Sequence, residues 1–160
     1  MITFVVNANN EKLKDAARLA QNFFKQLNIT DLPETFTHCE QSREEVYGAI
    51  IEAALCLPDR FVIVETTKLW AWSKVIGYTV PSRPNYIFIN SNMLGKLELA
   101  DYVGNFTHEF MHIIGFKHKG NYPNRFRNLE SVPYVMGSLA EAWVRGIEFE
   151  KTKQLEIEKV

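Results

Sequence analysis

One short stretch of the chain, HEFMHIIGFKH at residues 108–118, combines residue types and spacing that suit metal chemistry. His108 and His112 are four residues apart, so on a helix both imidazoles project from the same face. Gly115 allows the positive φ that ends a helix and turns the chain, which lets His118 return toward the other two histidines. Three neutral nitrogen ligands with an open fourth position are the arrangement of a catalytic zinc site. The stretch therefore predicts one catalytic Zn²⁺ ion bound by these three histidines.

Glu109 follows the first of these histidines, and the sequence here resembles the metzincin clan of zinc metalloproteases. The signature of the clan is H-E-x-x-H-x-x-G-x-x-H, followed downstream by a methionine turn. Met136, in the Val-Met-Gly stretch at 135–137, lies where the resemblance places that turn beneath the metal, just before the last helix. The resemblance implies a zinc-dependent endopeptidase, in which Glu109 acts as a general base toward water and then as a general acid toward the leaving amine.

A strand that binds the substrate is expected upstream of the histidines. Gly77, Tyr78, Thr79 and Val80 lie where proteases of this clan have an antiparallel edge strand above the cleft. An edge strand has free N–H and C=O groups, so a peptide or protein substrate can bind to it in extended form as an additional strand. The competing interpretation is that the neighbouring prolines and the short length only protect this edge from aggregation.

A tyrosine near the metal is a further expectation from the resemblance. Several metzincins have a tyrosine two residues after the turn methionine, but Ser138 occupies that position here, which places a tyrosine ligand there in doubt. Tyr122 and Tyr134 flank the region and are candidate contacts to the oxyanion or the substrate. The alternative for both tyrosines is a structural role.

The elements that must position these residues follow from hydrophobic periodicity. Runs of β-branched and other apolar residues predict strands at 2–7, 61–65, 76–80 and 86–90. Helical spacing of apolar residues predicts helices at 10–27, 43–55, 100–114 and 138–153, with 117–135 irregular and 151–160 frayed. This order predicts an α/β (α+β) fold, a mixed sheet followed by a small irregular C-terminal part. The resemblance implies the metzincin-like form of this fold, a twisted mixed sheet with backing helices and an active-site helix.

Length and composition limit the remaining possibilities. The 160 residues are expected to form a single catalytic domain, with an upper part at about 1–115 and a lower part at about 116–160 that carries the third histidine, the methionine turn and the last helix. A net charge of −1 argues against a nucleic-acid partner. No apolar run approaches the roughly 18 residues that a membrane span needs.

The compartment is inferred from weaker features. Cys39 and Cys56 fit free thiols in a reducing compartment, and the N-terminus lacks the basic and apolar regions of a signal peptide. We therefore expect a cytoplasmic location, and we also expect a monomer. Export without a cleavable signal, or a leader that has been trimmed, is the alternative.

Two other functions fit the same ligand set. One is a zinc amidase or peptidase that acts on a non-protein or modified-peptide amide. The other is a zinc-bound protein-interaction module without turnover. The presence of Glu109 speaks against the second alternative, because a binding module has no need of an acid/base residue.

Overall fold

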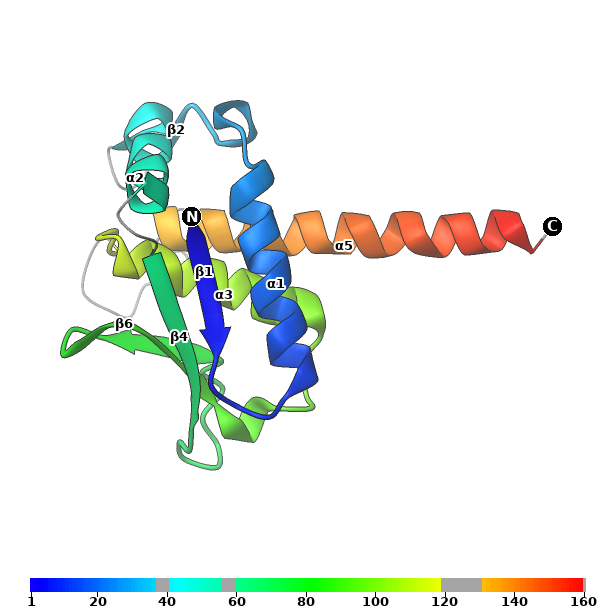
Figure 1. The fold of residues 1–160 in the computed structure, drawn as a ribbon, viewed down its shortest axis with the longest axis horizontal. Coiled ribbons are helices and arrows are strands. Elements are labelled where there is room, and N and C mark those ends of the chain that lie inside the picture. Colours follow the sequence, from blue (N-terminus) through cyan, green and yellow to red (C-terminus); the bar gives the residue numbers. More distant parts are fainter. Residues whose placement is uncertain (37–40, 56–59, 119–130, 160) are drawn as a thin grey trace.

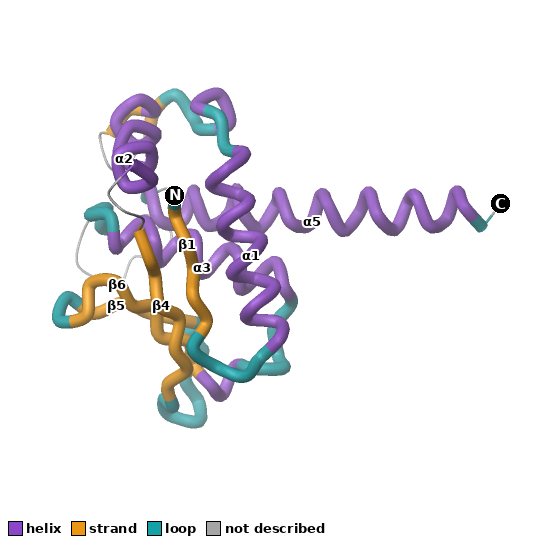
Figure 2. Tube along the Cα trace, in the orientation of Figure 1, coloured by secondary structure: helices purple, strands orange, loops and turns teal. Residues whose placement is uncertain are grey.

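A four-stranded mixed sheet lies at the centre of the computed structural model, which describes residues 1–36, 41–55, 60–118 and 131–159. The strand order is β1 (Ile2–Val6), β4 (Arg60–Thr67), β6 (Arg83–Asn90) and β5 (Gly77–Val80). The first three strands run parallel (Figure 1). Strand β5 pairs antiparallel with β6 at one edge of the sheet (Figure 2). The mixed sheet and the edge position of β5 confirm the prediction from sequence.

Four α-helices accompany this sheet within the described residues. They are α1 (Glu11–Gln26), α2 (Arg43–Leu55), α3 (Leu99–Ile113) and α5 (Val132–Glu158). Smaller elements are two 3₁₀ helices, η1 (Ile29–Asp31) and η2 (Ser91–Met93), and a two-stranded pair of β2 (Thr35–Phe36) with β3 (Gln41–Ser42) (Figure 2). No helix in the described ranges has both the length and the apolar character that crossing a membrane requires.

The main core lies between the sheet and the two helices α1 and α3, which pack against each other. Successive side chains of a strand point to opposite faces of a sheet. Val62 and Val64 of β4 are accordingly fully buried, as are Ile87 and Ile89 of β6, whereas the intervening Phe88 is only partly buried. The covered face of the sheet is therefore aliphatic where the helices contact it.

Aromatic rings fix α3 in this core. The ring of Phe110 lies 4.9 Å from that of Phe24 on α1 and 5.9 Å from that of Phe4 on β1, both edge-on. At about 100° per helical residue, Phe110 is on the side of α3 opposite His108 and His112. Burying the aromatic side of α3 therefore turns its histidines away from the core.

The last helix begins earlier and ends later than the sequence predicted. We expected 138–153, but α5 begins at Val132 and continues to Glu158, so the expected fraying of 151–158 is wrong. The physical reason for the early start lies in the first turn. Ser131 is the N-cap residue and its carbonyl accepts a hydrogen bond from the Val135 amide at 2.9 Å, while Pro133 stands in a first turn where its missing N–H costs nothing.

The predicted methionine turn is also wrong. Met136 lies inside α5 and is fully buried as part of the hydrophobic core. The helix continues through this position, and at Gly137 it approaches α3 closely, backbone against backbone. A Cβ on Gly137 would lie 2.9 Å from the Gly104 carbonyl oxygen, so a larger residue would separate the two helices.

Candidate metal centre

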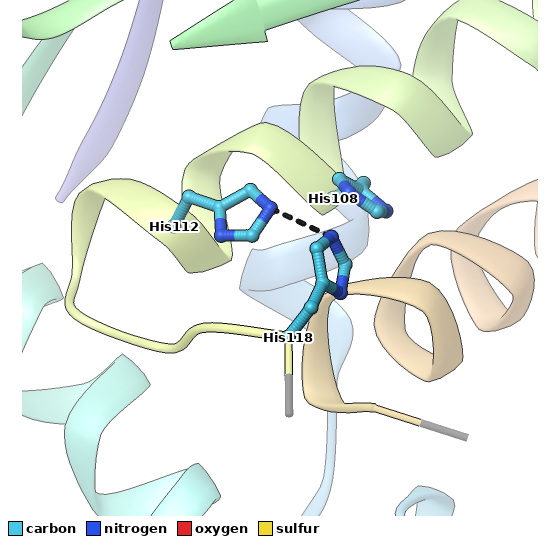
Figure 3. A group of neighbouring side chains, drawn as sticks. All are labelled: His108, His112 and His118. Atoms are coloured by element: carbon cyan, nitrogen blue, oxygen red, sulfur yellow. Dashed lines mark hydrogen bonds between the residues drawn. The ribbon is translucent and has the colours of Figure 1, made fainter. Parts of the chain in front are cut away.

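The end of α3 brings the three predicted histidines together. His108 and His112 occupy the last turns of the helix, and Gly115 ends it with a φ of 109°. The Gly115 amide donates to the His112 carbonyl at 3.0 Å, and the Phe116 amide donates to the Met111 carbonyl at 3.0 Å. The chain then turns back, so that one ring nitrogen from each of the three histidines lies within 4.8 Å of the others (Figure 3).

Hydrogen bonds to Nδ1 orient two of the rings. His112 Nδ1 is 2.7 Å from the Phe116 carbonyl oxygen, and His118 Nδ1 is 2.8 Å from Ser131 Oγ. These contacts leave the two Nε2 atoms facing each other at 3.1 Å. Ligand nitrogens on a tetrahedral zinc ion would be roughly 3.3 Å apart for zinc–nitrogen bonds of about 2.0–2.1 Å. The three histidines could therefore hold a metal ion, and the spacing of this pair is close to that of two nitrogen ligands on zinc.

The protonation state of the three imidazole rings is also compatible with metal binding. Burial, with smaller contributions from His112 and His118, lowers the pKa of His108 to about 3. Burial and then His112 lower the pKa of His118 to about 4. Burial also lowers the pKa of His112, against the hydrogen bond to the Phe116 carbonyl, which raises it. All three imidazoles are thus neutral at neutral pH, which is the protonation state that binds metal.

Glu109 lies beside this cluster and faces the edge strand. Its side chain is 6% exposed, and Oε1 is 4.0 Å from His108 Nε2. Burial raises the pKa of Glu109 to about 8, while a hydrogen bond from the Thr79 side chain lowers it. A bound cation nearby would favour the carboxylate form. Glu109 is therefore a buried titratable group beside the histidine cluster.

Strand β5 contributes to the site through alternate residues. Thr79 reaches Glu109, and Gly77 faces Asn105 on α3, where an added Cβ would clash with the Asn105 Oδ1 atom. Tyr78 points to the other face of the sheet, where its ring stacks on Phe88 with centroids 5.4 Å apart. The pairing of β5 with β6 is irregular between Tyr78 and Val80, at the position of Thr79.

The first turns of α5 form the other side of the site. The Tyr134 ring lies 4.5 Å from the His108 ring and 4.8 Å from the His118 ring. The structure thus brings Tyr134 to the histidines, whereas Tyr122 lies outside the described residues. A Cβ on Gly137 would lie 3.2 Å from the His108 Cβ atom, so this glycine also sets how closely α5 approaches the ligands.

Two contacts of the ligands were missed from sequence. Ser131 and the Phe116 carbonyl hold the Nδ1 atoms, and neither follows from the spacing of the motif. The available signal for Ser131 was its type, because a serine followed by Val-Pro is a typical helix start. It would have indicated where the helix begins, but not that its hydroxyl turns to a histidine.

Comparison with known proteins adds no family to this geometry. No protein-family model matches the chain, and no curated protein matches it. The mixed α/β fold and the cluster of three histidines therefore stand on the structure itself.

Proposed function

We propose that this protein is a zinc-dependent endopeptidase, with His108, His112 and His118 as zinc ligands and Glu109 as the general base and acid. The observation that supports this most is the position of Glu109, buried 4.0 Å from one ligand nitrogen and directly beside an edge strand. A zinc site with three protein ligands keeps a fourth position for water or substrate. The metzincin resemblance contributes the ligand motif alone, since Met136 lies within α5.

The proposed chemistry assigns the proton transfers to Glu109. When bound, zinc supplies a Lewis acid that polarises the scissile carbonyl and makes water more acidic. The Glu109 carboxylate accepts a proton from the attacking water and then donates it to the nitrogen of the leaving amine as the C–N bond breaks. The Thr79 hydroxyl donates to the carboxylate and so favours its charged, basic form. Such acid/base catalysis typically contributes about 10²–10⁴-fold to a rate.

The substrate class follows from strand β5. It is a short strand at the edge of the sheet. One of its sides pairs with β6, and the other side faces outward from the sheet. Its Thr79 reaches Glu109. A peptide that pairs with this edge would place its backbone carbonyls beside the acid/base residue. Tyr134, whose ring contacts those of His108 and His118, is the candidate contact for the developing oxyanion or for the substrate.

Cleavage of a diverse peptide pool, read by mass spectrometry, tests the proposal. The zinc-loaded wild type is compared with Glu109→Ala and with Glu148→Ala, which removes an exposed carboxylate far along α5. We expect cleavage by the wild type and by Glu148→Ala. Glu109→Ala should lose at least about 10²-fold in rate and still bind one zinc ion.

The other outcomes have distinct meanings. If all three proteins bind zinc and none cleaves peptides, endopeptidase activity is excluded, and an amidase of other specificity or a binding module takes its place. If Glu109→Ala cleaves as fast as the wild type, the role of Glu109 is wrong. If the wild type binds no zinc, the metal centre itself is wrong.

A further inference from the structure

Ser131 combines complete burial with an unusual use of its side chain. It is the N-cap residue of α5, a position where a serine hydroxyl ordinarily accepts a hydrogen bond from a backbone N–H of the first turn. Its side chain makes no such capping bond. Instead, Oγ lies 2.8 Å from Nδ1 of His118, and the residue is 0% exposed. The hydroxyl is thus directed to a histidine rather than to its own helix.

The direction of this hydrogen bond decides which nitrogen of His118 is free. A neutral imidazole has one N–H donor and one acceptor nitrogen. If Ser131 Oγ accepts from Nδ1–H, the lone pair is on Nε2, the atom that faces His112 Nε2 at 3.1 Å. The Phe116 carbonyl has no proton to give and can only accept, so it imposes the same tautomer on His112. Both rings are then prepared in the same way for a shared ion.

The position of Ser131 depends on the crossing of α3 and α5. Gly104 and Gly137 meet at this crossing, and a Cβ on Gly104 would lie 3.0 Å from the Gly137 carbonyl oxygen. This close approach brings the start of α5 against the end of α3, where the ligands are. His118 comes from the segment after α3 and Ser131 from the start of α5, so their hydrogen bond joins two elements that the glycine crossing holds together.

We propose that Ser131 is a positioning residue for the metal centre, which accepts a hydrogen bond from His118 Nδ1–H and thereby presents Nε2 as the ligand atom. This inference rests on the proposed metal centre. It extends that centre to α5, which lies outside the HExxHxxGxxH motif. Outer-shell partners of this kind typically change metal affinity by about 10–100-fold when they are removed.

The first experiment measures the affinity of the metal-free protein for Zn²⁺ at pH 7, by competition with a chromogenic chelator. We expect Ser131→Ala to bind zinc about 10–100-fold more weakly than the wild type. The matched control is Thr107→Val, which removes another fully buried hydroxyl, one that donates to the Val103 carbonyl at 2.9 Å instead of contacting a ligand. This control should keep wild-type affinity, and Ser131→Thr, which retains the hydroxyl, should recover most of what Ser131→Ala loses.

A second measurement needs no variant and separates tautomer control from a general effect on folding. Long-range proton–nitrogen NMR spectra of the zinc-loaded wild type should show His118 with a slowly exchanging Nδ1–H and with Nε2 bound to the metal. Binding through Nδ1 would overturn the proposal, as would equal zinc affinities for the wild type and Ser131→Ala. In both cases zinc still binds, so the metal centre would survive the failure of this inference, whereas a wild type without zinc binding would overturn both.

Discussion

The first half of α5 is packed against α3, whereas the second half extends away from the rest of the molecule (Figure 1). In the first half Met136, Ala140 and Val144 are fully or almost fully buried. In the second half Phe149, Leu155 and Ile157 are each more than half exposed. The same helix therefore has one part with extensive tertiary contacts and one part that is stabilised only as a helix.

This difference indicates which half of α5 can hold side chains in fixed positions at the candidate site. An isolated helix as short as either half of α5 is marginal in water. Most helical stability in proteins comes instead from packing of an apolar face. The packed half carries Ser131 and Tyr134 at its start, both beside the histidines. The first half therefore serves the candidate site through its packing, while the second half contributes little to it.

The largest expected effect comes from removing buried volume in the first half. Met136→Ala should lower the free energy of unfolding by about 2–5 kcal/mol, because it leaves a cavity in the core. Leu155→Ala, at a residue 57% exposed, should change it by no more than about 0.5 kcal/mol. Denaturant unfolding of the metal-free proteins checks both values. Equal losses would show that the second half is also packed against something in solution.

The pH dependence of the free energy of unfolding should show a somewhat smaller effect, which comes from the histidines beside the first half of α5. Their folded pKa values lie below the ordinary value of 6.5, so between about pH 6.5 and 4 the unfolded chain binds more protons and stability falls as pH falls. Glu109, with a pKa raised to about 8, acts in the opposite direction, so the comparison uses Glu109→Gln with and without His108→Asn.

The measurement is the free energy of unfolding of both metal-free variants at pH 6.5 and 4. The loss should be smaller by on the order of 2–3 kcal/mol when His108→Asn is present. The same loss in both variants would mean that His108 is not buried as a neutral group.

Two glycines of α5 form a matched pair, because the same substitution by alanine should change the free energy of unfolding in opposite directions at the two positions. A Cβ at Gly137 meets the Gly104 carbonyl oxygen at 2.9 Å, whereas a Cβ at Gly146 meets nothing within 4 Å. Gly137→Ala should therefore destabilise by about 1–3 kcal/mol and weaken zinc binding, because it moves α5 from the ligands. Gly146→Ala should stabilise by about 0.5–1 kcal/mol through helix propensity. Thermal unfolding and zinc titration of the two variants check this, and a stabilising Gly137→Ala would contradict the close crossing.

Local pattern was sufficient for much of this structure. The spacing of His108 and His112 predicts that their rings share one face, because helix periodicity fixes this without reference to the rest of the chain. Gly115 after them predicts the turn that returns His118 to the same place. The four strands of the mixed sheet and the helix Leu99–Ile113 were predicted within a few residues for the same reason, whereas the short pair of β2 and β3 was not predicted.

The parts that were wrong or missed depend on tertiary contact. We predicted irregular chain at 117–135, but α5 begins at Val132, since a proline such as Pro133 is tolerated in the first turn of a helix. Gly137 permits the close approach of α5 to Gly104. The metzincin resemblance placed Met136 in a turn, whereas it lies in α5. The contact of Ser131 with His118 links residues across 119–130, and no local pattern specifies it.

Zinc K-edge X-ray absorption of the purified, zinc-loaded chain tests the central claim most directly. With one zinc ion per chain, the spectrum should show about three imidazole nitrogens at roughly 2.0–2.1 Å and no sulfur ligand. His118→Ala should lose one of these nitrogens or the ion itself. A ligand set made up of oxygen or sulfur atoms would contradict the three-histidine metal centre. So would a zinc content well below one ion per chain if His118→Ala does not change it.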